Sequence, residues 1–260
     1  NATSQNIVKE YYDPAVVTND GFVFSESQQI SNLSFDLHDR ATHSQVKNYT
    51  AVAMTIASFR DMQDITYSSY DQFGNALLQT IDSYTTQTVD ALNIIDHKKI
   101  MNTYSDPVAQ RRGNTSSSVV DRWRTTTETT ANLVDQTINT TSLFDQFGNA
   151  MDQIQVTKVY DGTALVEASK RVMHNSSYNT RGDAAAQTVT SYLVDFPLSV
   201  RTETLVSYQE FTNRTYDSGH NITNQMILTY DKATVGKVLL DVQESRSIGF
   251  HSSGVALKQI

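Results

Sequence analysis

The sequence predicts an all-β fold: a repetitive array of antiparallel β-hairpins that forms an elongated sheet or solenoid-like rod, with about 36 residues per repeat. A seven-residue stretch recurs nearly verbatim, and the segments that flank it are rich in residues favoured in strands. The 260 residues include 32 Thr and 26 Ser, a bias that suits strands and turns. Helical periodicity is hard to find, and residues 125–130 contain five β-branched residues in six.

The repeat is clearest at residues 70–76 (YDQFGNA), which recur as residues 144–150 (FDQFGNA). The consensus is aromatic-Asp-x-x-Gly-Asn-Ala-x-x-Gln-x-x-x-x-Tyr. Copies start near residues 35, 70, 104, 144, 178, 216 and 250, at separations of 35, 34, 40, 34, 38 and 34 residues. Loop-length variation in a stacked array produces such drift.

In chain order, residues 1–11 match the second half of a motif, and the copy at 35 follows. Each regular copy predicts a strand, a turn and a strand; around the copy at 70 these are residues 65–70, 71–75 and 76–81. The copy at 104 is degenerate, because Pro107 and Gly113 disturb its spacing. The copy at 250 stops before its closing Tyr. We expect residues 1–260 to be a single repeat array, a window of a longer repetitive chain, or else a subunit completed by neighbouring copies of itself.

The predicted turn has a physical mechanism. An Asp side chain can accept from the backbone N–H two residues on, and a Gly three residues on can take the left-handed conformation. This combination suits a three- to five-residue hairpin loop. The residues expected in these turns are Asp71, Gly74, Asn75, Asp145, Gly148, Asn149, Asn179, Gly182, Asp217 and Gly219.

Stacked copies place equivalent residues in columns. Because strands lie about 4.8 Å apart, stacked hairpins advance about 10 Å per repeat, whereas a single-rung solenoid advances about 5 Å. The turn signal favours hairpins. The residues expected to form aromatic and polar ladders are Tyr70, Phe144, Tyr178, Tyr216, Gln79, Gln153, Gln187 and Gln225.

The aromatic-Asp-x-x-Gly unit followed by a Tyr resembles the tyrosine-aspartate (YD, or Rhs-type) repeats of very large bacterial surface and secreted proteins. Tyr70-Asp71 with Gly74, and Tyr216-Asp217, are the best matches. The resemblance implies long antiparallel sheets that spiral into shells or extended fibres, and an extracellular or cell-surface location. The Arg typical of that family after the turn Gly is replaced here by Asn75, Asn149 or Asp183.

Eight Asn-x-Ser/Thr sequons occur, and three of them, at Asn32, Asn175 and Asn213, stand three residues before a motif aromatic. That phase indicates a common solvent-facing position and makes these residues candidate N-glycosylation sites. The alternative is that a composition rich in Asn, Ser and Thr produces sequons by itself. Residues 181–183 spell Arg-Gly-Asp, the tripeptide that integrins read, but the turn alone explains them because they fall where residues 73–75 fall in another copy.

Composition and motifs exclude several functions. The net charge of −8 argues against a nucleic-acid partner, which would require a basic stripe. No apolar run approaches the roughly 18 residues that span a bilayer, and cysteine is absent. No zinc or calcium ligand spacing, nucleophile elbow or phosphate loop is present, so we expect no enzyme, no metal and no cofactor. The lone Trp123 beside Arg122 and Arg124 is either a sugar platform or ordinary sheet packing.

These features predict a non-catalytic structural segment of an extracellular fibre, filament or cell-surface sheath, whose partners are neighbouring repeats or copies of itself. The first alternative is an adhesin stalk or tip that binds glycans or a host surface. The second is a shell that encloses a cargo. Because a binding face should differ from copy to copy, the irregular copy at 104 is the place to look for a site.

Overall fold

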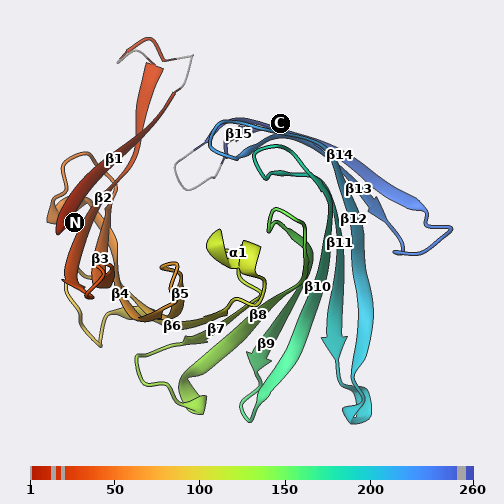
Figure 1. The fold of residues 1–260 in the computed structure, drawn as a ribbon, viewed down its shortest axis with the longest axis horizontal. Helices are drawn as coiled ribbons and strands as arrows, with labels where there is room; N and C mark the ends of the chain where they lie inside the picture. Colours follow the sequence, from red (N-terminus) through yellow and green to blue (C-terminus); the bar gives the residue numbers. More distant parts are fainter. Residues whose placement is uncertain (1, 13–15, 19–20, 251–255) are drawn as a thin grey trace. The chain divides into compact units, whose positions relative to one another are not determined.

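The computed structural model describes residues 2–12, 16–18, 21–250 and 256–260 (Figure 1). Within these residues the chain is nearly all strand. The strands are β1 (Ser4–Tyr12), β2 (Phe22–Phe35), β3 (Ala41–Tyr49), β4 (Phe59–Tyr70), β5 (Ala76–Tyr84), β6 (Ile94–Thr103), β7 (Ser117–Trp123), β8 (Leu133–Phe144), β9 (Ala150–Tyr160), β10 (Leu165–Tyr178), β11 (Ala184–Asp195), β12 (Thr202–Tyr216), β13 (Ile222–Tyr230), β14 (Leu239–Phe250) and β15 (Ala256–Gln259). The helical segments are α1 (Pro107–Arg111) and the 3₁₀ turns η2 (Ile56–Ser58), η3 (Thr130–Asn132) and η4 (Pro197–Ser199).

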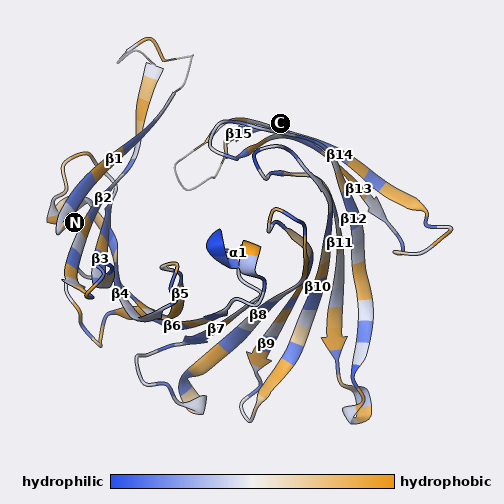
Figure 2. Ribbon diagram, in the orientation of Figure 1, coloured by the Kyte–Doolittle hydropathy of each residue, from blue (hydrophilic) through white to orange (hydrophobic). Residues whose placement is uncertain are grey.

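The strands form one open sheet in which they follow one another in chain order, from β1 to β15. Each pair whose register the structure describes is antiparallel, as in β2–β3, β4–β5 and β10–β11. Hydrophobic and hydrophilic residues are interspersed along strands such as β8 and β12 (Figure 2). The predicted all-β array of antiparallel hairpins is therefore confirmed, and the single-rung solenoid is not adopted.

Five motif copies form hairpins with the same register. In each, the motif aromatic pairs with the first residue after the turn, and the ladder is interrupted by β-bulges in the residues just before that aromatic. Bulges bend a strand and increase its local twist, so equal bulges keep successive hairpins alike. The pairs are Phe35↔Ala41, Tyr70↔Ala76, Phe144↔Ala150, Tyr178↔Ala184 and Tyr216↔Ile222.

The chain divides into two compact units. Unit 1 comprises Asn1–Met101, Val120–Val134 and Gly249–Leu257, and unit 2 comprises Asn102–Val119, Asp135–Ile248 and Lys258–Ile260. Each unit contains motif hairpins. The single array over residues 1–260 stays a prediction.

The core of unit 1 is aromatic. Tyr49, Met62, Tyr84 and Trp123 are buried in it, and Tyr49 meets Phe59 edge to face with ring centroids 5.9 Å apart. Because Trp123 is only 7% exposed, its indole contributes to packing and offers no open platform for a sugar.

Three loops of unit 1 have the same length of nine residues: 50–58, 85–93 and 124–132. Each is closed by a bond from the N–H of its first residue to the carbonyl of its last, at 2.8, 3.0 and 2.9 Å respectively. The period of the repeat therefore extends to the loops at the opposite ends of these strands.

The copy at 104 forms a helix where the other copies form a turn. Asp106 caps α1 by accepting from the N–H groups of Val108 and Ala109 at 2.9 and 2.8 Å, and Pro107 occupies the first helical turn, where its missing N–H costs nothing. Gly113, at φ +76°, ends the helix. In the described part of the chain, no helix is long and apolar enough to cross a membrane.

Candidate functional site

Each motif turn is organised by the side-chain oxygens of its first residue. In the turn 71–75, Asp71 Oδ1 accepts from the N–H groups of Phe73 and Asn75, both at 2.9 Å. Asp71 Oδ2 accepts from Asn75 Nδ2 at 2.8 Å. The turn 145–149 repeats these three bonds at 2.9, 2.8 and 2.9 Å. The local sequence thus builds the same rigid reversal at each copy.

The turn 179–183 makes the same bonds with the acid and the amide exchanged. Here Asn179 Oδ1 accepts from the N–H groups of Arg181 and Asp183, and Asn179 Nδ2 donates to Asp183 Oδ2 at 2.8 Å. In these three turns one acid therefore pairs with one amide, and either can stand first; in the turn 36–40 Arg40 takes the place of the amide and donates to Asp36.

The fourth residue of each turn has a positive φ. Gly74, Gly148 and Gly182 hold this position at +87°, +78° and +86°, and Asp39 and His220 hold it in the other two turns. Gly219 therefore lies one residue before the left-handed position of its turn. Its N–H donates to Asp217 Oδ1 at 2.8 Å, the bond that Phe73 makes in the turn 71–75.

These bonds favour the ionised form of the turn acids. Arg40, which donates to Asp36 through its side chain and backbone, lowers the pKa of Asp36 to about 2. Desolvation acts to raise the pKa of Asp145 and Asp217, but the side-chain and backbone bonds from Asn149 and Asn221 outweigh it, and both pKa values are lowered.

The motif tyrosines join each copy to the one before it. Tyr70 donates through its hydroxyl to the carbonyl of Ala41 at 2.5 Å, and Tyr216 donates to Ala184 at 2.5 Å. Tyr178 donates in the same way to Ala150. The acceptor is in each case the first residue after the preceding turn, so one motif position serves as donor and another as acceptor throughout.

A copy that starts with Phe lacks this hydroxyl. In the copy at 35, Asn32 Nδ2 donates to the carbonyl of Ala2 at 2.8 Å, and Ala2 is the equivalent acceptor in the partial motif at 1–11. In the copy at 178 both donors are present, since Asn175 Nδ2 also donates to Ala150 at 2.8 Å. The asparagine three residues before the aromatic is thus a second donor to the same carbonyl.

Arginines provide a further bond between neighbouring turns. Arg40 Nη1 donates to the carbonyl of Asp71 at 3.0 Å, and Arg181 Nη2 donates to that of Asp217 at 2.7 Å. Between α1 and the turn 145–149, Arg112 Nη1 donates to the carbonyl of Phe147 at 2.5 Å.

Two of the motif glutamines donate within their own hairpins, and one of them, Gln187, also accepts from Arg214 of the next hairpin at 3.0 Å. Gln187 Nε2 donates to Asn175 Oδ1 at 3.0 Å, Gln153 donates to Thr141 at 3.4 Å, and Gln79 lies opposite Tyr67 in the register. Gln225 Oε1 is buried with no hydrogen-bond partner among the described residues.

The three sequons in phase do not share a solvent-facing position. Asn175 is only 5% exposed, and both its amide nitrogen and its oxygen are hydrogen-bonded. Asn32 is half-buried and likewise bonded through both atoms. Asn213, at φ +53°, is exposed. The expectation of a common exposed position is wrong, because Asn32 and Asn175 use this position to donate to the preceding copy.

The Arg-Gly-Asp sequence is part of a turn. Asp183 is 7% exposed. One of its carboxylate oxygens accepts from Asn179 and Arg181, and the other bonds His220 Nδ1 at 2.5 Å. A receptor that needs a free Asp carboxylate would find it occupied.

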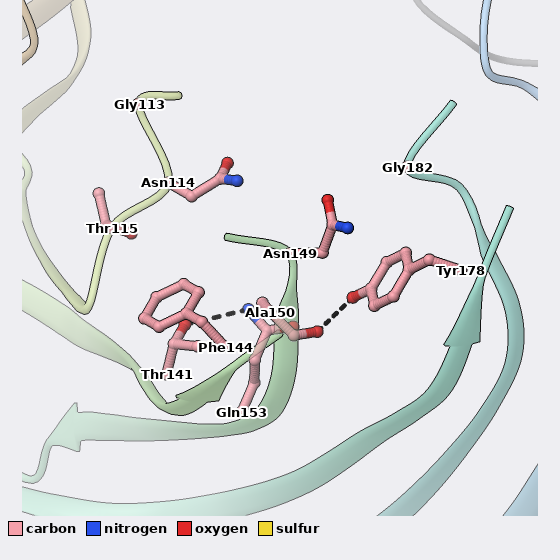
Figure 3. Close-up of a pocket in the computed structure, with 10 residues that line it drawn as sticks. All are labelled: Gly113, Asn114, Thr115, Thr141, Phe144, Asn149, Ala150, Gln153, Tyr178 and Gly182. Atoms are coloured by element: carbon pink, nitrogen blue, oxygen red, sulfur yellow. Dashed lines mark hydrogen bonds between the residues drawn. The ribbon is translucent and has the colours of Figure 1, made fainter. Parts of the chain in front are cut away.

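The irregular copy creates two adjoining hollows in unit 2. They lie where α1 meets the turns 145–149 and 179–183, and they share Asn149, Tyr178 and Gly182. Figure 3 shows the Asn149 amide between Asn114 on one side and the Tyr178 ring on the other. We call these hollows, of about 330 and 430 Å³, the α1 hollow.

A close approach of backbone holds α1 in place. A Cβ on Gly148 would lie 2.8 Å from the backbone N and Cα of Ala109, so only glycine fits there. Asn114 Nδ2 also donates to the carbonyl of Gly148 at 2.9 Å. Gly148, which the turn requires for its positive φ, thus also allows α1 to pack closely against the turn.

Histidines pair with acids of neighbouring strands or turns and form no metal centre. No group of three or more His, Asp or Glu that could hold an ion occurs within the described ranges. The pairs are His43–Asp64, His97–Asp82, His174–Asp152 and His220–Asp183.

Two predicted features fall outside the described residues: Asn1 of the partial motif, and residues 251–255, which carry the turn of the copy at 250. Comparison with models of known protein families found no match, and comparison with curated protein sequences found none either.

Proposed function

We propose that this chain is a non-catalytic structural segment of an extracellular fibre, filament or cell-surface sheath, built from tyrosine-aspartate-type repeats. The observation that carries this proposal is that three links between neighbouring copies use the same two motif positions. Tyr70, Tyr178 and Tyr216 each donate to the first residue after the preceding turn. A hairpin that bonds the preceding hairpin through the same motif positions can be added repeatedly to a growing array.

The mechanism is additive. Each hairpin buries its apolar residues and satisfies its strand edges only against neighbours, so stability grows with the number of copies. Turn acids, Arg bridges and tyrosine hydroxyls resist sliding of one hairpin past the next. The abundant Thr and Ser keep the exposed faces soluble.

The experiment is immunogold electron microscopy of intact cells of the source organism with antibodies raised against the 260-residue chain. The proposal expects gold particles along continuous filaments or a sheath outside the cell. Label confined to the cell interior, or to isolated particles, would contradict it.

A further inference from the structure

The α1 hollow is the one place in the described chain where an irregular copy adds new side chains to a motif turn. Its walls come from the end of α1 and from two turns that are themselves rigid. A hollow built on such fixed elements is a better binding site than one on a mobile loop.

One aromatic side chain of the α1 hollow, Phe147, is more exposed than its counterpart Phe73 in unit 1, which is 44% exposed. The hollow between turns 36–40 and 71–75 uses the same motif positions, but there Arg40 lies over the Tyr70 ring, 4.6 Å from its centroid. Asn149 replaces that arginine beside Tyr178, whose ring lines both parts of the α1 hollow. Phe147, at its rim, is 61% exposed.

Two arginines, Arg112 and Arg181, and one acid line the α1 hollow. Asp145, which also lines it, accepts three bonds within its own turn. Arg112 Nη2 lies 3.3 Å from the position that a Cβ would take on Gly182, and Arg181 directly precedes Gly182 in the chain. Arg112 donates only through Nη1. Arg181 donates only through Nη2, to the Asp183 carboxylate at 3.0 Å and to the carbonyl of Asp217. Each guanidinium therefore keeps N–H groups without an acceptor among the described residues.

Neutral polar groups complete the lining. Asn114, Asn149, Gln153 and Thr141 present amides and a hydroxyl to the same space, and Figure 3 shows them around the Phe144 and Tyr178 rings. Aromatic faces pack on the C–H faces of sugar rings, amides bond their hydroxyls, and a planar guanidinium bonds a carboxylate in bidentate fashion.

We propose that the α1 hollow binds a carboxylated saccharide, such as a uronic-acid residue of an acidic polysaccharide. The sugar ring packs against Phe147 and Tyr178. Its carboxylate lies between Arg112 and Arg181. This site would attach the filament to an acidic glycan at the irregular copy.

The test is isothermal titration calorimetry of the 260-residue chain with tetragalacturonate, and with maltotetraose as the neutral counterpart. The chain carries a net charge of −8, so it repels an anionic sugar overall. Saturable binding of tetragalacturonate would therefore indicate a local site. We expect tetragalacturonate to bind and maltotetraose to bind at least tenfold more weakly, since a charged hydrogen bond is worth about a factor of ten.

Matched variants locate the site. Phe147→Ala and Arg112→Gln should each weaken tetragalacturonate binding about tenfold. Two variants in unit 1 should leave it unchanged: Phe73→Ala, at the same motif position as Phe147, and Arg40→Gln, which removes an arginine that also donates to a carbonyl of the following turn. Circular dichroism checks that each variant is folded; if Arg112→Gln unfolds, the exposed Phe147 still provides the test. Absence of binding, equal binding of maltotetraose, or equal losses in both variant pairs would overturn the proposal.

Discussion

At the residue scale, the carbonyl of the first residue after each turn receives the bond that joins two copies. Ala150 accepts from both Tyr178 and Asn175, whereas Tyr216 is the side-chain donor found on Ala184. Removal of the tyrosine hydroxyl therefore leaves the Ala150 carbonyl with one side-chain donor and the Ala184 carbonyl with none of those described.

Tyr216→Phe should lower the free energy of unfolding by about 1 kcal/mol, because it leaves a half-buried carbonyl without its donor. Tyr178→Phe should cost less, since Asn175 remains on Ala150. Urea unfolding of the two variants measures the difference. Tyr160→Phe, whose hydroxyl bonds Gly162 within its own loop, is the control for loss of a tyrosine hydroxyl. Equal unfolding midpoints for Tyr216→Phe and the parent chain would show that the inter-copy bond contributes nothing.

The exchanged pair in the turn 179–183 provides a double-mutant cycle. Asn179→Asp places two carboxylates together and should destabilise the chain by about 1–2 kcal/mol. Adding Asp183→Asn restores one acid and one amide in the order of the turn 71–75 and should recover most of that loss. Chemical unfolding of the four proteins gives the coupling. A double variant no more stable than Asn179→Asp would refute the pairing.

The sequence predicts the turn acids and glycines because their roles are local. It could not distinguish Tyr from Phe as inter-copy donors, since both read as motif aromatics. Nor could it show that Asn32 and Asn175 bond a neighbouring copy, because that contact depends on which strand lies alongside.

At the element scale, five copies are hairpins of one register and the copy at 104 carries a helix. The alternation of strand-forming residues and the Asp-x-x-Gly signal are enough to predict the hairpins. The helix has its own signals, Asp106-Pro107 at the start and Gly113 at the end, which are typical helix boundaries. Read only as a disturbed repeat, they indicate irregularity but not α1.

The packing of α1 on the turn 145–149 can be tested at two equivalent glycines. Gly74→Ala and Gly148→Ala both put a side chain at positive φ, which costs about 1 kcal/mol. At Gly74 the new Cβ would lie 3.9 Å from the nearest atom, the Arg40 Cδ, whereas at Gly148 it would lie 2.8 Å from Ala109 backbone. Gly148→Ala should therefore lower the unfolding free energy clearly more. Equal effects in thermal unfolding would mean that α1 is not docked on this turn.

At the scale of the whole molecule, each unit repeats one set of bonds among turns and strands, and few residues are fully buried. The ionised turn acids contribute to stability through the bonds that they accept. The all-β class, the hairpins and their spacing could be predicted because they follow from local period and turn chemistry. The division into two units could not, because it depends on contacts between distant parts of the chain.

The lowered pKa values predict acid sensitivity. An acid whose pKa is lower in the folded than in the unfolded chain stabilises the fold above its usual pKa and loses that contribution as pH falls through the folded value. For Asp36 the window runs from 3.8 to about 2, and the pKa values of Asp145, Asp183 and Asp217 shift in the same direction. The thermal midpoint should therefore fall as the pH is lowered from 4 towards 2. A midpoint that stays constant over this range would contradict the role of the turn acids.

The central claim is that one motif hairpin, repeated along the chain and bonded each time to the preceding hairpin, builds an extended array. Electron cryomicroscopy of the native filament at strand-resolving resolution tests it most directly. The account predicts strands stacked about 4.8 Å apart along the filament, with a motif turn about every 10 Å on one side. Compact separate particles, or strands that stack in another direction, would contradict it.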